Sequence, residues 1–311
     1  MSGNLRLTGS LVLALLVAVV LAAVGPVAAQ EPVRIGLMPD LNSLIYIIAQ
    51  EQGLFAEAGV EVELVKFTSA NTRDAALHAG EIDGAVSDVL AALFAIDGGF
   101  PVKATWLTEG RYALLASPSS GITSPEEMRG KRVAISKNTI IDYATDQLLL
   151  HYNVDPQQLR KTSIPQVPVR MQMLASGRID AACLPDPLAT AAELGGAVVV
   201  SDTLQVHITP SVMVFRTASL REKGEELKRV IAAYNQAATL INSTPASQWL
   251  FAYEAMGFPE MTWTEIQLPH YRQAQPPIAA DVERVYHWMR DRGLITGTYG
   301  YSDIVDSFWL D

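Results

Sequence analysis

The stretch LHAGEIDGAVSD, from Leu77 to Asp88, has a near-copy in LASGRIDAACLPD, from Leu174 to Asp186. Each copy has a helix-like run that ends at a glycine, an Ile-Asp pair, small apolar residues typical of a buried parallel strand, and an acidic residue where that strand should end. The repetition predicts two α/β units of one design. Because open α/β sheets bind ligands at the carboxyl edge of their strands, the two units are expected to form the facing walls of a ligand cleft.

The chain begins with the pattern of an export signal. Arg6 supplies a basic start, Leu11–Val24 is an uninterrupted apolar run, and Val27–Ala29 has the small residues of a signal-peptidase site. The apolar run is shorter than the roughly 20 residues of a spanning helix, which favours cleavage over an uncleaved membrane anchor. We therefore predict a signal peptide at 1–29, cleaved after Ala29, and an exported, soluble mature protein that is periplasmic or associated with the cell surface.

Length, charge and cysteine content limit the classes of function. The chain has 311 residues, of which 49% are hydrophobic, enough for two domains with their own cores. The net charge of −10 argues against nucleic acid or anionic lipid as a partner, because both need clustered Lys and Arg. Cys183 is the single cysteine, so no intrachain disulfide is possible, and we expect it to be a buried strand residue.

Candidate ligand-binding side chains follow the predicted strands, where helix N-termini offer free N–H groups to an anion or a carbonyl. In the first unit they are Asp40, Asn42, Ser43, Ser69, Asn71, Thr72, Asp88 and Trp106. In the second unit they are Asn138, Thr139, Tyr143 and Asp186.

Several of these polar residues are equally well explained as helix caps. For Asn71, Thr139 and Asp186 capping and ligand contact are compatible, whereas Asp88 is better explained as a cap. Ser43 is also placed to cap the helix that follows it. The pair Asn71 and Asp74 resembles a capping box, as does the pair Thr139 and Asp142.

The two aromatic candidates have a structural and a functional interpretation. Trp106 and Tyr143 could be ordinary core or rim aromatics. A tryptophan at the carboxyl end of a strand also suits a stacking platform for a planar ligand, and the sequence leaves both possibilities open.

Three strings together resemble the solute-binding proteins of bacterial ABC importers in the nitrate, sulfonate, taurine and thiamine-pyrimidine group. They are GLFAEAGVEVELVKF at Gly53–Phe67, the AGEIDGAVSD that follows it, and GKRVAIS at Gly130–Ser136. The resemblance implies a type II periplasmic binding protein fold, α/β in class, with two lobes and a cleft that closes on a small ligand by a hinge. It implies an ABC permease and its cytoplasmic ATPase as partners of a monomer. In this family the position of Asp186-Pro187 is often Glu-Pro.

On this basis we expect lobe 1 to comprise residues 30–116 and 207–311, and lobe 2 to comprise residues 117–206. The boundaries rest on the break at Pro118–Gly121 and on the return of the chain through Thr209-Pro210.

The composition of the predicted cleft bears on the class of ligand. Its only cations are Lys137 and Arg73, and acids and aromatics outnumber them. This balance favours a planar heteroaromatic vitamin or precursor, riboflavin or a thiamine-precursor pyrimidine, stacked on Trp106 or Tyr143. The alternative within the same group is an alkanesulfonate, taurine or nitrate.

An enzyme is the rival class, because the resemblance extends to pyrimidine-precursor synthases that use a cysteine-rich motif. This chain lacks that motif, its five histidines show no metal-ligand spacing, and it has neither a Gly-x-Ser-x-Gly elbow nor a phosphate loop. A structural surface protein is disfavoured because nothing repeats beyond the one doubled unit. We therefore predict binding without catalysis, with no cofactor and no metal.

Overall fold

The computed structural model describes residues 31–208 and 210–307. The predicted signal peptide, its apolar run and its cleavage site lie outside this range. Among the described residues, no helix has the length and apolar character needed to cross a membrane.

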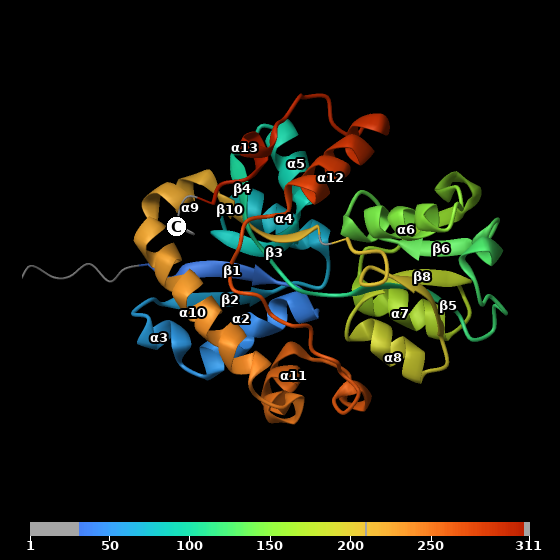
Figure 1. Cartoon of the computed structure of the whole chain (residues 1–311), viewed down its shortest axis with the longest axis horizontal. Helices are drawn as coiled ribbons and strands as arrows, with labels where there is room; N and C mark the ends of the chain where they lie inside the picture. The colour runs from blue at the N-terminus through green and yellow to red at the C-terminus, as the bar shows by residue number, and fades with distance from the viewer. Residues whose placement is uncertain (1–30, 209, 308–311) are drawn as a thin grey trace, which may run out of the picture. The chain divides into compact units, whose positions relative to one another are not determined.

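The first of two mixed sheets is built around the first copy of the repeat (Figure 1). In sheet order its strands are β2 (Val62–Lys66), β1 (Val33–Leu37), β3 (Gly84–Asp88), β10 (Ser211–Arg216) and β4 (Val102–Leu107). β10 runs antiparallel to both of its neighbours, whereas β1, β2 and β3 are parallel.

The second sheet repeats this pattern around the second copy. In sheet order its strands are β7 (Arg160–Ser163), β6 (Arg132–Ile135), β8 (Ala181–Pro185), β5 (Tyr112–Ala116) and β9 (Val198–Asp202). Here β5 is the strand that runs antiparallel to its neighbours. Cys183 is buried in the central strand β8, as predicted.

We call each sheet with its covering helices a lobe. The helices of the first lobe are α2 (Leu41–Glu51), α3 (Leu54–Glu57), α4 (Ala70–Ala79), α5 (Val89–Asp97), α9 (Thr217–Glu222), α10 (Gly224–Asn242), α11 (Leu250–Met256), α12 (Ala279–Asp291) and α13 (Tyr301–Ile304). Those of the second lobe are α6 (Ile140–His151), α7 (Val167–Ala175) and α8 (Leu188–Leu194). Short 3₁₀ turns are η1 (Pro125–Met128), η2 (Pro156–Gln158), η3 (Ala246–Trp249) and η4 (Glu260–Thr262).

The predicted lobe boundary after residue 116 needs correction. It places Tyr112–Ala116 in the first lobe, but this segment is β5 and pairs with β8 and β9 of the second sheet. The chain crosses between the sheets earlier, at residues 108–111, where there is no cluster of turn residues. Gly110 permits this crossing because a Cβ there would lie 2.2 Å from the side-chain nitrogen of Asn42.

The Ile-Asp pair of the repeat has the same structural role in both lobes. Asp83 Oδ2 accepts the backbone N–H of Arg34 on β1 at 2.8 Å, and Asp180 Oδ2 accepts that of Arg132 on β6 at 2.8 Å. The preceding glycines, Gly80 and Gly177, take the left-handed backbone that ends each helix, with φ of 78° and 67°. Each copy therefore caps a helix and fixes the neighbouring parallel strand.

Helix capping follows the prediction in part. Asp88 caps α5 through the Ala91 N–H, and Thr139 caps α6 through the Ile141 N–H, as predicted. Two other predictions are wrong. Asp40 rather than Ser43 caps α2, and Ser69 rather than Asn71 caps α4, so both helices begin earlier than predicted.

Candidate ligand site

A small buried cavity lies where the carboxyl edges of the two sheets face each other, and we call it the inner cavity. It offers about 40 Å³ of room for the centres of water molecules. Since one water needs about 10–15 Å³ on this measure, the inner cavity can hold about three waters or the head group of a small ligand. Its lining comes from both lobes: Met38, Asp40, Ala70, Arg73, Val86, Ser87, Asp88, Tyr112, Ser136, Thr139, Ile140, Ile141, Pro165, Val167, Arg170 and Pro185.

Two arginines line the inner cavity from equivalent positions of the repeat. Arg73 and Arg170 each stand seven residues before the glycine of their copy. Arg73 Nη1 donates to the carbonyl of Val86 at 3.1 Å, and Arg170 Nε donates to that of Cys183 at 2.9 Å. Both guanidinium groups are buried beside the central strand of their own sheet.

The electrostatic surroundings of the two arginines differ. Arg73 Nε donates to Asp74 Oδ1 at 2.9 Å, and its Nη2 lies 3.9 Å from Asp88 Oδ2. Burial lowers the pKa of Arg73, but these carboxylates outweigh burial and leave it raised. Arg170 has no carboxylate within ion-pair distance among the described residues, and burial lowers its pKa to about 10. Arg170 is thus a buried cation, protonated at neutral pH, whose charge the described residues do not compensate.

Four polar groups of residues that line the inner cavity have no hydrogen-bond partner within the described part of the chain. They are the Nη2 atoms of Arg73 and Arg170 and the hydroxyls of Ser87 and Ser136, all four buried. Arg73 Nη2 still has an ionic partner, because it lies 2.8 Å from Asp74 Oδ1. Leaving a buried polar group unsatisfied costs about 1–3 kcal/mol, and more for a charged group. Arg170 Nη2 and the two hydroxyls come from different segments and line one cavity, an arrangement that suits an oxygen-rich, negatively charged guest.

Two carboxyl groups lie on the same walls. Burial raises the pKa of Asp88 to about 6, against the effect of Arg73. Burial also raises the pKa of Asp40, whose carboxylate accepts the N–H of Ser43 at 3.0 Å. Protonation of either acid would make the inner cavity more positive.

The structure brings five of the predicted site residues to the cleft. Asp40, Asp88 and Thr139 line the inner cavity. Asn71 and Asn138 lie outside it, in an open groove that shares Asp88 and Thr139 with the inner cavity.

The other polar candidates serve the fold. Asn42 bonds to Tyr112 and Thr108 near the crossing at residues 108–111, and the Ser43 hydroxyl accepts the Met38 N–H. Ser69 and the exposed Thr72 bond to each other at the start of α4. Asp186 pairs with Arg111 and accepts from Thr190, and it does not line the inner cavity.

The predicted cleft positions of both aromatic residues are wrong. Trp106 has no exposed surface, and its indole N–H donates to the Tyr46 hydroxyl at 3.1 Å within the first-lobe core. Tyr143 is equally buried and meets Trp288 edge-on at 5.5 Å between ring centroids. Neither side chain lines the inner cavity, so neither is a stacking platform there.

Sequence reasoning missed Arg170, and it counted Arg73 as a cation of the cleft without including it among the candidate ligand-binding residues. The repeat carried the signal, because extending the comparison of the two copies four residues upstream of Leu77 and Leu174 aligns the two arginines. Tyr112, whose hydroxyl lies 3.2 Å from that of Ser211, was missed because β5 was assigned to the wrong lobe.

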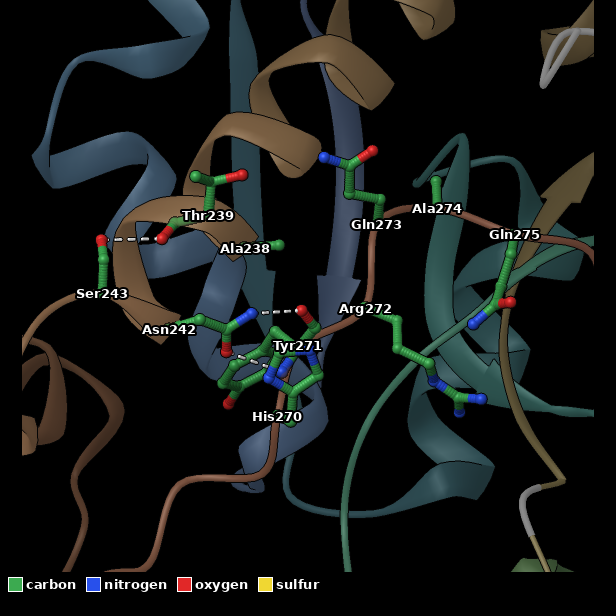
Figure 2. Close-up of a pocket in the computed structure, with 10 residues that line it drawn as sticks. All are labelled: Ala238, Thr239, Asn242, Ser243, His270, Tyr271, Arg272, Gln273, Ala274 and Gln275. Atoms are coloured by element: carbon green, nitrogen blue, oxygen red, sulfur yellow. Dashed lines mark hydrogen bonds between the residues drawn. The ribbon is translucent and has the colours of Figure 1, made fainter.

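A larger groove of about 610 Å³ lies on the first lobe, away from the inner cavity (Figure 2). It runs between the end of α10 and the extended segment His270–Gln275. Asn242 bonds to both the N–H and the carbonyl of Tyr271, at 3.0 and 2.7 Å, and Arg272 pairs with Glu109. The Asn242 bonds hold the extended segment on α10, and the Arg272 pair holds it on the crossing at residues 108–111. These contacts give no indication of a ligand. Among the described residues no cluster of His, Cys, Asp or Glu could hold a metal ion.

The sequence is similar to that of a known periplasmic binding protein. An ABC transporter periplasmic binding protein of Brachyspira hyodysenteriae is 27% identical over 229 residues, covering 68% of this chain and 66% of that protein. The chain therefore spans slightly less than two thirds of the length of this relative.

Solved structures share the fold at low sequence identity. The aliphatic sulphonate binding protein SsuA of Escherichia coli is 19% identical and superposes with a TM-score of 0.74 over 90% of this chain and 93% of that one. The desulfurization enzyme DSZB is 15% identical, with a TM-score of 0.64 over 90% of this chain and 98% of that one. The fold is that of the periplasmic binding proteins, as the sequence predicts, and it occurs in binding proteins and in at least one enzyme.

The family model described as NMT1/THI5 like matches residues 40–248, which include both copies of the repeat and both arginines. The chain belongs to the NMT1/THI5-like family.

Proposed function

We propose that this protein is the extracytoplasmic solute-binding component of an ABC importer and that it captures a small oxoanion or organic acid. The transport role is supported by the family and by the periplasmic binding protein among its relatives. Its partners would then be a permease and a cytoplasmic ATPase, and its export would depend on the signal peptide predicted at 1–29.

The observation that carries the choice of an anion is Arg170. Its guanidinium is buried in the inner cavity, lacks a carboxylate partner among the described residues and leaves Nη2 without a hydrogen bond. An uncompensated buried charge is costly, and an anionic guest would offset that cost while satisfying the Ser87 and Ser136 hydroxyls.

A heteroaromatic vitamin is disfavoured by two features. Its predicted stacking partners, Trp106 and Tyr143, are buried away from the inner cavity. The room for about three waters also falls short of a pyrimidine or a flavin, which would need the lobes to separate. A sulfonate or nitrate, the alternative weighed from the sequence, fits both the charge and the size.

We propose binding without catalysis. The described residues at the inner cavity include no cysteine and no histidine, and the hydroxyls of Ser87 and Ser136 have no hydrogen bond to a described group that could act as a general base. Mass spectrometry of a bound anion recovered unchanged after long incubation would support this proposal, and a recovered product would overturn it.

Calorimetric titration tests the ligand class directly. Nitrate, methanesulfonate, taurine, riboflavin and a hydroxymethyl aminopyrimidine would each be titrated into the mature protein. Micromolar or tighter binding of at least one of the three acid-derived compounds, with neither heteroaromatic bound, is the expected result. Tight riboflavin or pyrimidine binding without any anion binding would overturn the proposal.

A further inference from the structure

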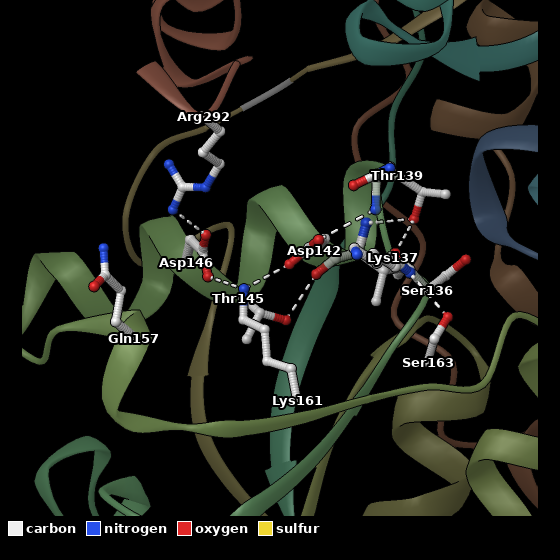
Figure 3. A network of polar contacts seen from close by, with 12 residues as sticks. Ser136, Lys137, Thr139, Asp142, Thr145, Asp146, Gln157, Lys161, Ser163 and Arg292 are labelled. Atoms are coloured by element: carbon white, nitrogen blue, oxygen red, sulfur yellow. Dashed lines mark hydrogen bonds and ion pairs between the residues drawn. The ribbon is translucent and has the colours of Figure 1, made fainter. Parts of the chain in front are cut away.

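A second buried polar cluster lies beside the ligand site and joins the two lobes (Figure 3). Its centre is Asp146 on α6 of the second lobe, whose side chain is fully buried. Asp146 Oδ2 accepts the indole N–H of Trp288 at 3.1 Å and a guanidinium N–H of Arg292 at 2.5 Å. Both donors stand one turn apart at the end of α12, which belongs to the first lobe.

α12 is held firmly in the first lobe. Val285, Trp288 and Met289 are buried in the same apolar cluster as the helix α5 and the strand β4. The Arg292 guanidinium lies 4.3 Å from the centre of the Trp288 ring, so the two donors are oriented together. α12 cannot follow the second lobe without breaking this packing, and separation of the lobes would therefore break both bonds to Asp146.

The same cluster extends to the ligand loop. The Lys161 ammonium pairs with Asp146 and, at 2.5 Å, with Asp142 Oδ1. Asp142 Oδ2 accepts the backbone N–H of Asn138 at 3.1 Å. Asn138 takes a left-handed backbone with φ of 60°, directly before Thr139 at the inner cavity. Asp142 thus holds the loop at the inner cavity, and Lys161 links Asp142 to Asp146, the acid that accepts the two bonds from the first lobe.

Charge within the cluster is balanced only when the lobes meet. Asp142 and Asp146 supply two negative charges, and Lys161 and Arg292 supply two positive ones. Without Arg292 one lysine would face both acids. Burial raises the pKa of Asp146. The charge of Lys161 lowers this pKa, and that of Arg292 lowers it to a smaller extent.

We propose that Asp146, Trp288 and Arg292 form a latch that holds the lobes closed, and that Lys161 and Asp142 couple this latch to the ligand loop at Asn138 and Thr139. Arg292 and Asp146 are positioning residues: they do not line the inner cavity, but they set the fraction of molecules in which that cavity is assembled. The latch goes beyond the proposed function, because it acts on closure whichever ligand binds.

The test compares two arginines of one helix region. Arg292→Gln removes the charged donor to Asp146. Arg290→Gln is the matched control, since within the described residues Arg290 donates only to the carbonyls of Thr296 and Gly297, both in the first lobe. Two quantities are measured on the ligand-free protein. They are the radius of gyration from small-angle X-ray scattering and the distance between fluorophores attached at exposed positions of each lobe.

The expected result is a larger radius and a longer inter-lobe distance for Arg292→Gln, with Arg290→Gln unchanged from wild type. For a probe anion that binds wild type, Arg292→Gln should weaken apparent affinity about tenfold, mostly through faster dissociation. Equal radii and inter-lobe distances for both variants would overturn the latch. Because the ligand-free readouts need no ligand, a failure of the proposed anion specificity would leave this test intact.

Discussion

The two copies of the repeat share a backbone design but differ in how each compensates its arginine. Both lobes place an arginine seven residues before the glycine, bond it to the central strand and fix a neighbouring strand by an aspartate. Arg73 has Asp74 and Asp88 beside it, whereas the position equivalent to Asp74 is Met171. One arginine is therefore compensated within the fold, and the other, Arg170, is the group that we propose binds an anionic ligand.

The largest expected effect that tests this difference between the lobes comes from removing Arg73. Arg73→Met should cost about 3–5 kcal/mol of unfolding free energy at neutral pH, because it leaves Asp88 as an uncompensated buried charge. Urea unfolding measures this cost. Adding Asp88→Asn to Arg73→Met should recover part of the loss, and no recovery would show that the pair is not electrostatically coupled.

The equivalent change in the second lobe should affect binding rather than folding. Arg170→Met should weaken binding of the probe anion by about 2–3 kcal/mol, roughly 30- to 150-fold, because a charged hydrogen-bond partner is lost. Its cost in stability should be smaller than that of Arg73→Met, since the lost bonds to carbonyls are offset by removal of an uncompensated charge. Calorimetry and urea unfolding on the same samples separate the two effects. Unchanged anion affinity in Arg170→Met would remove the basis of the proposed ligand class.

The aspartates of the two Ile-Asp pairs should also differ in how much they stabilise their lobes. Asp83 is buried and bonds to Lys223, Ser219 and the Arg34 N–H, whereas Asp180 is partly exposed and pairs with Arg132. We expect Asp83→Asn to cost about 2 kcal/mol and Asp180→Asn about 0.5 kcal/mol. Thermal or urea unfolding of both variants measures the difference, and equal costs would contradict the asymmetry.

The stability that Asp83 contributes should depend on pH. Burial acts to raise its pKa, but the Arg34 N–H and Lys223 outweigh burial and leave the pKa lowered. The stabilisation is therefore present above the ordinary aspartate pKa near 4 and is lost as pH falls below it. Asp83→Asn should accordingly show less loss of stability between about pH 4 and pH 2 than wild type.

Much of the fold was predictable because its signals are local. Gly80 and Asp83 act on residues close to them in sequence or on the adjacent strand, and their copies in the second lobe report the same geometry. The inner cavity was less accessible to prediction. Whether an arginine is compensated depends on which side chains the fold brings near it, and a motif comparison that stopped at Leu77 did not reach Arg73.

Binding should also depend on pH through Asp88. Its pKa, raised to about 6 mainly by burial, means that it gains a proton as pH falls from 7 to 5, which removes a negative charge from the inner cavity. Anion affinity should therefore rise several-fold over this range. Asp88→Asn should bind the anion well at both pH values and lose most of the dependence, whereas an unchanged pH profile in Asp88→Asn would assign the effect to another group such as Asp40.

The smallest expected effect on binding concerns Trp106, and it depends on another difference between the lobes. Trp106 lies on β4, whose counterpart in the second sheet is the partly exposed β9. The first lobe alone adds α10, and the ring of Trp106 packs on Tyr234 of that helix and on Phe215, at centroid distances of 6.2 and 5.4 Å. The burial of Trp106 thus depends on residues more than a hundred positions later in the chain, which no pattern near β4 could reveal.

Trp106→Phe should lower stability by about 1–2 kcal/mol through the lost bond to Tyr46 and the smaller ring, while anion affinity stays within twofold of wild type. Calorimetric titration of Trp106→Phe with the probe anion, after thermal unfolding has shown that the variant is folded, measures both quantities. A tenfold loss of affinity in a folded variant would show that Trp106 contributes to ligand binding and would contradict its assignment to the core.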